Sequence, residues 1–273
     1  MTTPDENIAS PDHATLDAML GFAEETATKV RAIALDWFRK PIAIDTKADE
    51  SPVTIADRSV EQAIRRAIAE RFPEHGILGE EYGLSHSDAE YVWSIDPIDG
   101  TRSFISGYPL WGSLLALLRH GKPVLGVIDI PCTGERWTGS IHRGSLFSGR
   151  PCRTRSTQSL GEAILYTTTP DIFGDGELQS FERLSRAVHL RRFGGDCYNY
   201  GLLASGHIDL VLEAGLQPYD YLAMAPIIEQ AGGIVTDWSG NALSMHSSGQ
   251  VLASANPALH EQALALVNKT TNQ

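Results

Sequence analysis

One short segment, residues 95–101, constrains this chain more than any other. It follows Tyr91–Ser94, an aromatic and β-branched run that is typical of a buried strand. Asp96 and Asp99 therefore emerge where a strand is expected to end, and the proline and glycine beside them restrict the turn. Such a turn can aim both carboxylates and the backbone carbonyl of Ile98 at one point. Magnesium and other hard divalent cations prefer an all-oxygen ligand set of this kind.

The same segment closes with Gly100 and Thr101. Their backbone N–H groups stand where a helical turn could begin, and amides at a helix start form a natural cradle for phosphate. Asp-Pro and Asp-Gly pairs are also common turn formers, so Asp96 and Asp99 taken alone are open to a structural interpretation. The other acidic motifs of the chain decide between the metal-binding and the turn-forming interpretations of Asp96 and Asp99.

Three further acidic motifs accompany this segment. Gly79-Glu80-Glu81 lies upstream, and Tyr219-Asp220 lies downstream, before an apolar helical stretch at 222–231 that ends in a glycine pair. Thr54-Ile55-Ala56-Asp57 precedes a second helical pattern and fits a capping box, in which Asp57 would stabilise the helix start.

In this order the motifs resemble the inositol monophosphatase superfamily of magnesium-dependent, lithium-sensitive phosphatases. The resemblance extends from about Lys47 to Thr236. Within the superfamily, the segment Phe193-Gly194-Gly195-Asp196-Cys197-Tyr198 is most similar to the histidinol-phosphatase branch. Tyr219-Asp220 departs from the Trp-Asp that is commoner in the superfamily. This difference affects the expected packing and substrate shape, and not the expected binding of the metal.

The resemblance implies a fold of the α+β or α/β class, an alternating α-β-α-β-α layered sandwich. The hydrophobic pattern of the chain agrees with this architecture. We expect a flexible tail at residues 1–12, an N-terminal α+β half at 13–149 with the metal-binding loops, and a C-terminal α/β half at 150–273 with the substrate-binding elements. The hydrophobic pattern of the first half predicts two amphipathic helices and an antiparallel meander. The pattern of the second half predicts alternating strands and helices.

The resemblance also implies the metal ligands. Glu80, Asp96 and the Ile98 carbonyl would bind a first magnesium, and Asp96, Asp99 and Asp220 a second, with the two ions roughly 4 Å apart. The alternative for Asp220 is an N-cap of the following helix. Glu81 would orient water near a third magnesium, or it is a solvated neighbour.

The resemblance further implies that Asp57 and Thr101 are a catalytic pair, which would position and deprotonate the attacking water. The capping role of Asp57 is compatible with this one. The amides of Gly100 and Thr101 would hold the phosphate, and Lys47 is either a phosphate neighbour or a surface lysine.

Substrate selection is expected to depend on Asp196, Glu213 and Asn199. Inositol-specific relatives carry small residues at the position of Asp196. A carboxylate there suits the ammonium and imidazole of histidinol phosphate. The alternative is that these are ordinary acids at loop or strand ends.

Composition excludes several other functions. A net charge of −12 argues against a nucleic-acid partner, and no apolar run approaches the roughly 20 residues of a membrane helix. The nine histidines lack zinc-helix spacing, and Gly-x-Ser-x-Gly and Walker motifs are missing from the sequence. Three cysteines without a Cys-x-x-Cys pair are typical of a reducing compartment, so we expect a cytoplasmic protein.

These observations predict a magnesium-dependent phosphomonoesterase with two or three ions per site and direct attack by water. The preferred substrate is histidinol phosphate, in histidine biosynthesis. The alternatives are inositol monophosphate, nucleotide or sugar bisphosphates, and a non-catalytic relative that binds phosphorylated metabolites or a protein. A homodimer is expected from the resemblance.

Overall fold

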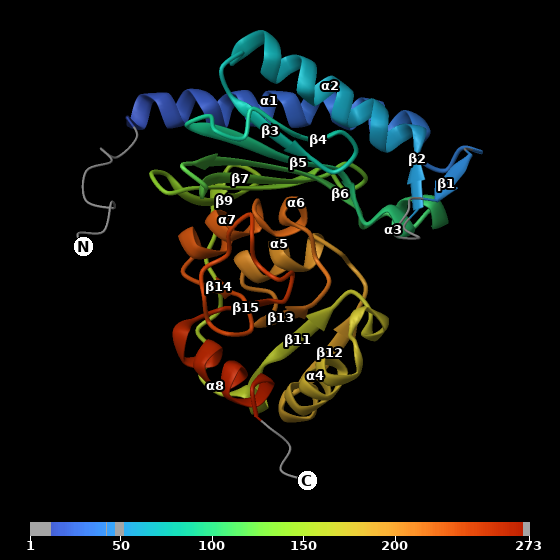
Figure 1. The fold of residues 1–273 in the computed structure, drawn as a ribbon. Coiled ribbons are helices and arrows are strands. Elements are labelled where there is room, and N and C mark those ends of the chain that lie inside the picture. Colours follow the sequence, from blue (N-terminus) through green and yellow to red (C-terminus); the bar gives the residue numbers. More distant parts are fainter. Residues whose placement is uncertain (1–11, 42, 47–51, 270–273) are drawn as a thin grey trace.

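The computed structural model describes residues 12–41, 43–46 and 52–269. The predicted tail lies outside this range except for its last residue, and Lys47 lies outside it too. Helices α1 (His13–Trp37) and α2 (Ile55–Arg71) pack side by side over one face of a large sheet (Figure 1). Asp12 caps α1, and Thr54 with Asp57 closes the predicted capping box at the start of α2.

The large sheet has eight strands in the order β10-β9-β8-β7-β6-β5-β3-β4. The strands are β3 (Gly76–Gly79), β4 (Gly83–Ser85), β5 (Tyr91–Asp99), β6 (Gly112–Arg119), β7 (Lys122–Ile130), β8 (Glu135–Ser140), β9 (Gly144–Phe147) and β10 (Arg150–Pro151). The expected antiparallel meander is formed by β6, β7 and β8, and the structure extends it by β5 on one side and by β9 and β10 on the other. Strand β3 pairs with β5 in parallel. A separate two-stranded ribbon, β1 (Ile44–Thr46) with β2 (Pro52–Thr54), lies beside α3 (Thr101–Ser106) in Figure 1.

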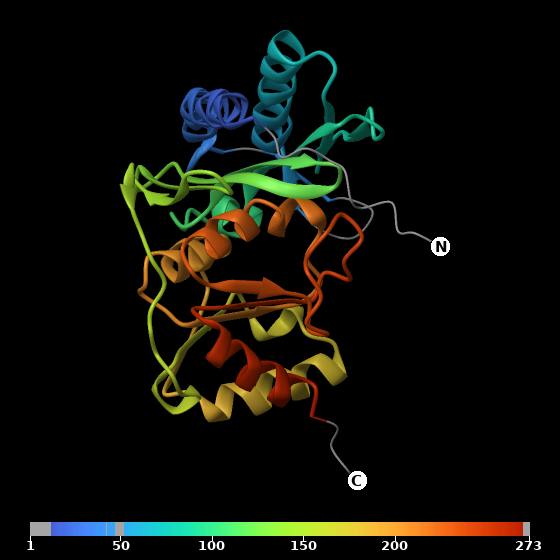
Figure 2. The ribbon, with the colours of Figure 1, turned by 90° about the vertical axis from the view of Figure 1, so that its left-hand side faces the viewer.

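An extended segment, residues 152–159, leads from the large sheet to a second sheet of five strands (Figure 2). Its order is β12-β11-β13-β15-β14, formed by β11 (Ile164–Thr167), β12 (Leu190–Phe193), β13 (Leu210–Glu213), β14 (Ile234–Thr236) and β15 (Val251–Ser254). The β11–β12 and β11–β13 pairs are parallel and the others antiparallel, so the sheet is mixed, as the alternating pattern predicts.

Helices fill the space between the sheets and cover the outer face of the second one. The middle layer holds α5 (Tyr198–Ala204), α6 (Pro218–Tyr221) and α7 (Met224–Gln230), and the outer layer holds α4 (Asp175–Ala187) and α8 (Pro257–Val267) (Figure 1). Two short 3-10 turns, Leu160–Glu162 and Pro170–Ile172, flank β11. The expected α-β-α-β-α sandwich is therefore confirmed. None of the described helices is long and apolar enough to cross a bilayer.

The middle layer approaches the large sheet closely at two glycines. A Cβ on Gly126 would lie 2.8 Å from the carbonyl carbon of Ala223, and one on Gly139 would lie 2.6 Å from the nitrogen of Ile227. Both distances are shorter than a Cβ atom can approach backbone atoms without a clash. Only glycine at positions 126 and 139 therefore permits this packing of α7. The helix predicted at 222–231 occurs as α7, which begins at Met224, and the short helix α6 precedes it. Pro226 has no N–H to donate to the Leu222 carbonyl, which interrupts the backbone hydrogen bonds between α6 and α7.

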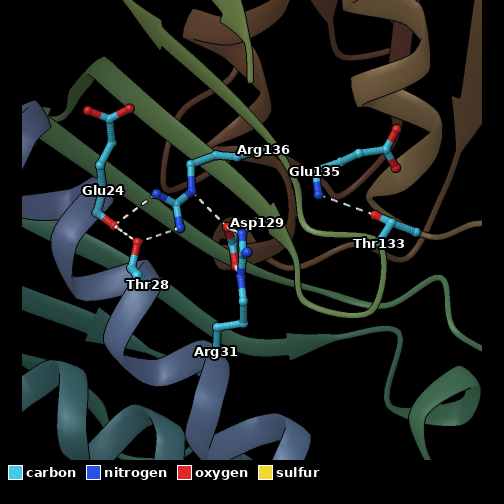
Figure 3. A network of polar contacts seen from close by, with 7 residues as sticks. All are labelled: Glu24, Thr28, Arg31, Asp129, Thr133, Glu135 and Arg136. Carbon is cyan, nitrogen blue, oxygen red and sulfur yellow. Dashed lines mark hydrogen bonds and ion pairs between the residues drawn. The ribbon is translucent and has the colours of Figure 1, made fainter. Parts of the chain in front are cut away.

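A buried carboxylate fixes α1 on the large sheet (Figure 3). Asp129 of β7 is fully buried and accepts hydrogen bonds from Arg31 Nε of α1 at 3.0 Å and from Arg136 Nε of β8 at 2.7 Å. Arg136 also donates to the Glu24 carbonyl and to the Thr28 hydroxyl of α1. Because the two guanidinium groups compensate the charge of Asp129, this network orients α1 without an unpaired charge.

Candidate active site

Acidic side chains from both halves of the chain converge where the large sheet meets the middle layer. Carboxylate oxygens of Asp96, Asp99 and Asp220 all lie within 4.8 Å of one another. Glu80, directly after β3, lines the same cavity, whose volume is about 580 Å³. The structure thus brings together the four side chains that the sequence motifs predicted as ligands.

The course of β5 explains how two of these acids meet. The expectation that the strand ends before the acids is wrong, because β5 continues to Asp99 and stays paired with β6. Residues three apart on a regular strand point to opposite faces of the sheet. The pairing with β6 shifts register between Asp96 and Asp99, and the Ile98 N–H turns back to donate to Asp96 Oδ1 at 3.0 Å. Both carboxylates consequently face the cavity.

Asp220 reaches the cluster from the second half. It is not the N-cap of the helix that follows, as the structural alternative supposed. It is the third residue of α6, and its Oδ2 accepts the backbone N–H of Gln217 at 2.7 Å in a capping-box arrangement. This bond fixes the carboxylate at the helix start, with its remaining acceptor capacity directed to the other acids.

The cluster is electrostatically unfavourable without a cation. Burial raises the pKa of Asp96 well above its usual range, and the nearby charges of Glu80, Asp99 and Asp220 raise it further. Burial likewise raises the pKa of Asp220 to about 7. The pKa of Asp99 is also raised, chiefly by burial, although the Cys197 N–H at 2.6 Å favours its charged form. Carboxylates that repel one another in one cavity, with oxygen as the only donor type, fit a hard divalent cation.

Asp57 and Thr101 meet beside this cluster. One oxygen of Asp57 accepts the N–H and hydroxyl of Thr54 at 2.8 and 2.6 Å, and the other lies 3.5 Å from the Thr101 hydroxyl. The same hydroxyl lies 3.2 Å from the Ile98 carbonyl oxygen, which it can approach as a donor. Both interpretations of Asp57 are therefore compatible with the geometry, because the carboxylate caps α2 and contacts Thr101.

Gly100 and Thr101 begin α3 at the rim of the cavity. Gly100 has a φ of 83°, a left-handed conformation, and a Cβ there would also come within 2.9 Å of the Asp196 carboxylate. Asp196 accepts a hydrogen bond from the Ser103 hydroxyl at 2.8 Å. Burial raises its pKa. The predicted phosphate-binding and substrate-selecting residues thus touch each other.

Glu213 and Asn199 occupy different positions. Glu213, at the end of β13, lines the cavity and accepts hydrogen bonds from the N–H and hydroxyl of Thr168 and from the Tyr200 hydroxyl. Burial raises its pKa to about 7 in spite of these donors. Asn199 is fully buried and is not among the described residues that line the cavity, so its side chain lies behind the wall.

The cavity wall includes residues that the sequence did not single out. They include Arg102, Ser103, Tyr108, Thr168, Thr169, Asp171, Ile172, Leu216 and Met224. Arg102 follows Thr101 directly, so its position in the motif could have identified it. Asp171 lies in a 3-10 turn far along the chain, and no local pattern marks it. Glu81, by contrast, is not among the described lining residues, and its N–H donates to Glu61.

Comparison with known proteins gives four findings. The chain matches the inositol monophosphatase family over residues 15–272. It is 43% identical over 258 residues to the bifunctional phosphatase IMPL2, chloroplastic, of Arabidopsis thaliana, covering 91% of this chain and 75% of that protein. It is 35% identical over 250 residues to the histidinol-phosphatase of Chlorobaculum parvum, covering 91% and 96% respectively. Among solved structures, an inositol monophosphatase from Zymomonas mobilis is similar with a TM-score of 0.86 and 43% identity, covering 93% of this chain and 98% of the other.

Proposed function

Because the chain belongs to the inositol monophosphatase family, we propose that it is a magnesium-dependent phosphomonoesterase whose substrate is histidinol phosphate. The observation that carries the phosphatase activity is the convergence of Glu80, Asp96, Asp99 and Asp220 on one cavity. Their order along the chain and their chemistry match what a phosphate-ester enzyme with bound divalent cations requires.

These four carboxylates and the Ile98 carbonyl are the groups that would hold Mg²⁺, in two or three ions per site. Bound Mg²⁺ would neutralise phosphate charge and stabilise the developing alkoxide of the leaving group. The raised pKa values of Asp96 and Asp220 support this assignment, since a cation among the acids relieves the repulsion that raises them.

The remaining groups act on water and on the phosphate. The Thr101 hydroxyl, between Asp57 and the Ile98 carbonyl, would orient the attacking water, and Asp57 would accept its proton. The backbone amides of Gly100 and Thr101 would bind the equatorial phosphate oxygens at the cavity rim. Glu81, which is not among the described residues that line the cavity, would act through the loop that carries Glu80.

The preference for histidinol phosphate rests on charge. Seven carboxylates line the cavity, and four of them are accounted for by the metal site. The other three are Asp171, Asp196 and Glu213, whereas Arg102 is the one lysine or arginine among the described lining residues. Histidinol phosphate carries an ammonium and an imidazole, which such acids would bind, whereas a neutral polyol needs no carboxylate. A cation beside Glu213 would also favour its charged form against the cost of burial.

Inositol monophosphate is the second candidate. It is favoured by the likeness to the Zymomonas mobilis inositol monophosphatase, which has the same 43% identity as the Arabidopsis thaliana phosphatase. The names of relatives therefore do not decide between the two esters, and the charge of the cavity is the argument for the first.

Phosphate release from histidinol phosphate and from inositol 1-phosphate, measured across a Mg²⁺ titration, tests the proposal. We expect activity only with Mg²⁺, at least tenfold higher kcat/KM on histidinol phosphate, and loss of turnover in Asp96→Asn, which has lost one charge of the cluster. A preference for the inositol ester would overturn the substrate assignment. No Mg²⁺-dependent release from any ester in a wider panel of sugar and nucleotide phosphates would overturn the enzymatic proposal and favour a binding protein.

A further inference from the structure

Glu61 of α2 is a fully buried carboxylate that contacts the loop carrying Glu80. Its Oε2 accepts the backbone N–H of Glu81 at 2.7 Å, and its Oε1 lies 3.2 Å from the backbone N–H of Tyr82. The two amides directly after Glu80 are thus bound by one side chain. Neither the capping pattern of α2 nor the acidic motifs of the sequence marks this residue.

Arg65 completes the contact from one turn further along α2. Its Nε donates to Glu61 Oε1 at 2.7 Å, and its Nη2 donates to the carbonyl of Gly83 at the far end of the same loop. The Arg65 side chain is 18% exposed, so it compensates the buried charge while remaining partly hydrated. The loop from Gly79 to Gly83 is therefore attached to α2 through its amides and through a carbonyl.

Gly79 shows how close this contact is. A Cβ at position 79 would overlap the Glu61 carboxylate and come within 2.8 Å of Arg65 Nη2. The φ of Gly79 is not positive, so close approach and not backbone conformation requires glycine here. The Gly-Glu-Glu motif thus begins with the one residue type that lets Glu61 reach the amides behind it.

The spacing along α2 gives this contact a function. Asp57 and Glu61 are four residues apart and lie on one face of the helix. Asp57 contacts Thr101, whereas Glu61 contacts the Glu80 loop. One rigid helix therefore locates two parts of the site relative to each other: the hydroxyl that orients water and the strand-end acid of the metal cluster.

We propose that Glu61 is a positioning residue, which holds the Glu80 carboxylate at the distance and direction that metal binding requires. This inference rests on the proposed function in one respect, because it takes Glu80 to be a metal ligand. Groups that orient a ligand from behind typically change metal affinity by about 10- to 100-fold when they are removed. A glutamine at position 61 keeps the shape but presents one acceptor oxygen where the loop and Arg65 need two.

The test compares Glu61→Gln with Asp209→Asn. Asp209 is a matched control: it is fully buried, accepts the Ile164 N–H at 2.8 Å and pairs with Arg155 at 3.3 Å, but it lies at the opposite end of β13 from Glu213. Mn²⁺ binding to the full-length protein is measured by electron paramagnetic resonance with Mg²⁺ as competitor, alongside melting temperature. We expect both variants to lose thermal stability. Only Glu61→Gln should weaken Mn²⁺ and Mg²⁺ binding, by about tenfold or more.

Three results decide the inference. Unchanged metal affinity in a destabilised Glu61→Gln would show a purely structural role and overturn the proposal. Should that variant not fold, Glu61→Asp, which keeps both oxygens on a shorter side chain, is expected to weaken metal binding about threefold, and wild-type affinity would again overturn it. Because the readout is metal binding, a wild type that binds Mn²⁺ but hydrolyses no ester overturns the proposed function and leaves the role of Glu61 supported by the variants.

Discussion

The hydroxyl of Thr101 lies 3.5 Å from one oxygen of Asp57, and the other oxygen of that carboxylate closes the start of α2. The Asp57 side chain therefore both stabilises the start of α2 and positions the Thr101 hydroxyl at the site. The two roles use different oxygens, so substitutions can separate them.

Asp57→Asn and Thr54→Ala separate the two roles. The asparagine retains the shape of the side chain but is a poor proton acceptor, so we expect kcat to fall by about 100-fold or more. Thr54→Ala removes a cap at a cost of about 1 kcal/mol in unfolding free energy and should leave kcat within about threefold. Steady-state kinetics and thermal unfolding of both variants check this. Equal losses of kcat in the two would show that Asp57 acts through the helix alone.

Asp196→Ala tests whether the carboxylate selects a cationic substrate. Loss of a charge-assisted hydrogen bond costs about 1.5–3 kcal/mol, so kcat/KM for histidinol phosphate should fall by about 10- to 100-fold. Inositol 1-phosphate hydrolysis should change by less than about threefold, since a polyol has no cation for Asp196. Ser103→Ala, which removes the donor 2.8 Å from Asp196 but keeps the charge, is the control. Similar losses on the two esters would exclude Asp196 as a selector.

Gly79→Ala introduces a Cβ that overlaps Glu61. Overpacking of this kind costs about 1–3 kcal/mol, and because the loop must move, the Mg²⁺ concentration for half-maximal activity should rise. Gly21→Ala in α1 is the control, because a Cβ there meets no atom within 4 Å. It should stabilise the protein by about 0.5–1 kcal/mol. A Mg²⁺ dependence unchanged by Gly79→Ala would show that the loop accommodates the methyl group without moving Glu80.

His260 predicts a pH dependence of stability. Its ring is buried between the hydroxyls of Thr236 and Ser254, each 2.9 Å away, and burial lowers its pKa from 6.5 to about 4. The unfolded chain therefore binds the proton more readily than the folded one. The contribution of His260 is present above pH 6.5 and is lost as the pH falls towards about 4, amounting to at most about 3 kcal/mol.

A comparison of wild type with His260→Gln isolates this effect, since all other groups titrate in both proteins. The difference in unfolding free energy should be largest near neutral pH and should shrink as the pH falls to about 4. Urea denaturation at several pH values measures it. A difference that stays constant over that range would contradict the depressed pKa.

Asp129→Ala tests the network in Figure 3. Removing the buried carboxylate leaves Arg31 and Arg136 without their partner, and because their side chains are 25% and 16% exposed they can partly rehydrate. We expect a loss of about 3 kcal/mol. Arg143→Ala, which breaks the more exposed pair with Asp17, should cost less than about 1 kcal/mol. Urea unfolding that gives equal losses would show that the network does not fix α1.

Local sequence signals locate several elements with their bounds. The hydrophobic pattern predicts a strand at 190–193 and helices at 198–204 and 257–267, and the structure has the strand Leu190–Phe193 and the helices Tyr198–Ala204 and Pro257–Val267. In the last helix, Asn256 caps the start and a proline follows it, which are strong local determinants. No local signal marks the strand Gly76–Gly79, because its two apolar residues between glycines give no period and its partner Tyr91–Asp99 is distant in sequence.

The site was less accessible to sequence reasoning. The order of the acidic motifs indicated the four carboxylates through a family resemblance, and their convergence became visible only when both sheets were in place. Glu61 follows Val60 on a charged helix and is indistinguishable in sequence from a solvated glutamate, yet it is fully buried. The burial of Glu61 depends on which loop packs against the helix. The hydrophobic periodicity of a single sequence does not indicate this packing.

The register shift in β5 has a consequence for the history of such chains. Asp96 and Asp99 face the same cavity only because the irregularity between them offsets the alternation of the strand. Inserting or deleting one residue there would turn one carboxylate to the other face of the sheet, whichever amino acids were used. Descendants of this chain can accordingly exchange side chains in that interval but not alter its length, whereas the exposed residues 86–88, which follow β4, are free to lengthen. The fixed spacing of Asp96 and Asp99 is thus a reference point for the alignment of divergent sequences.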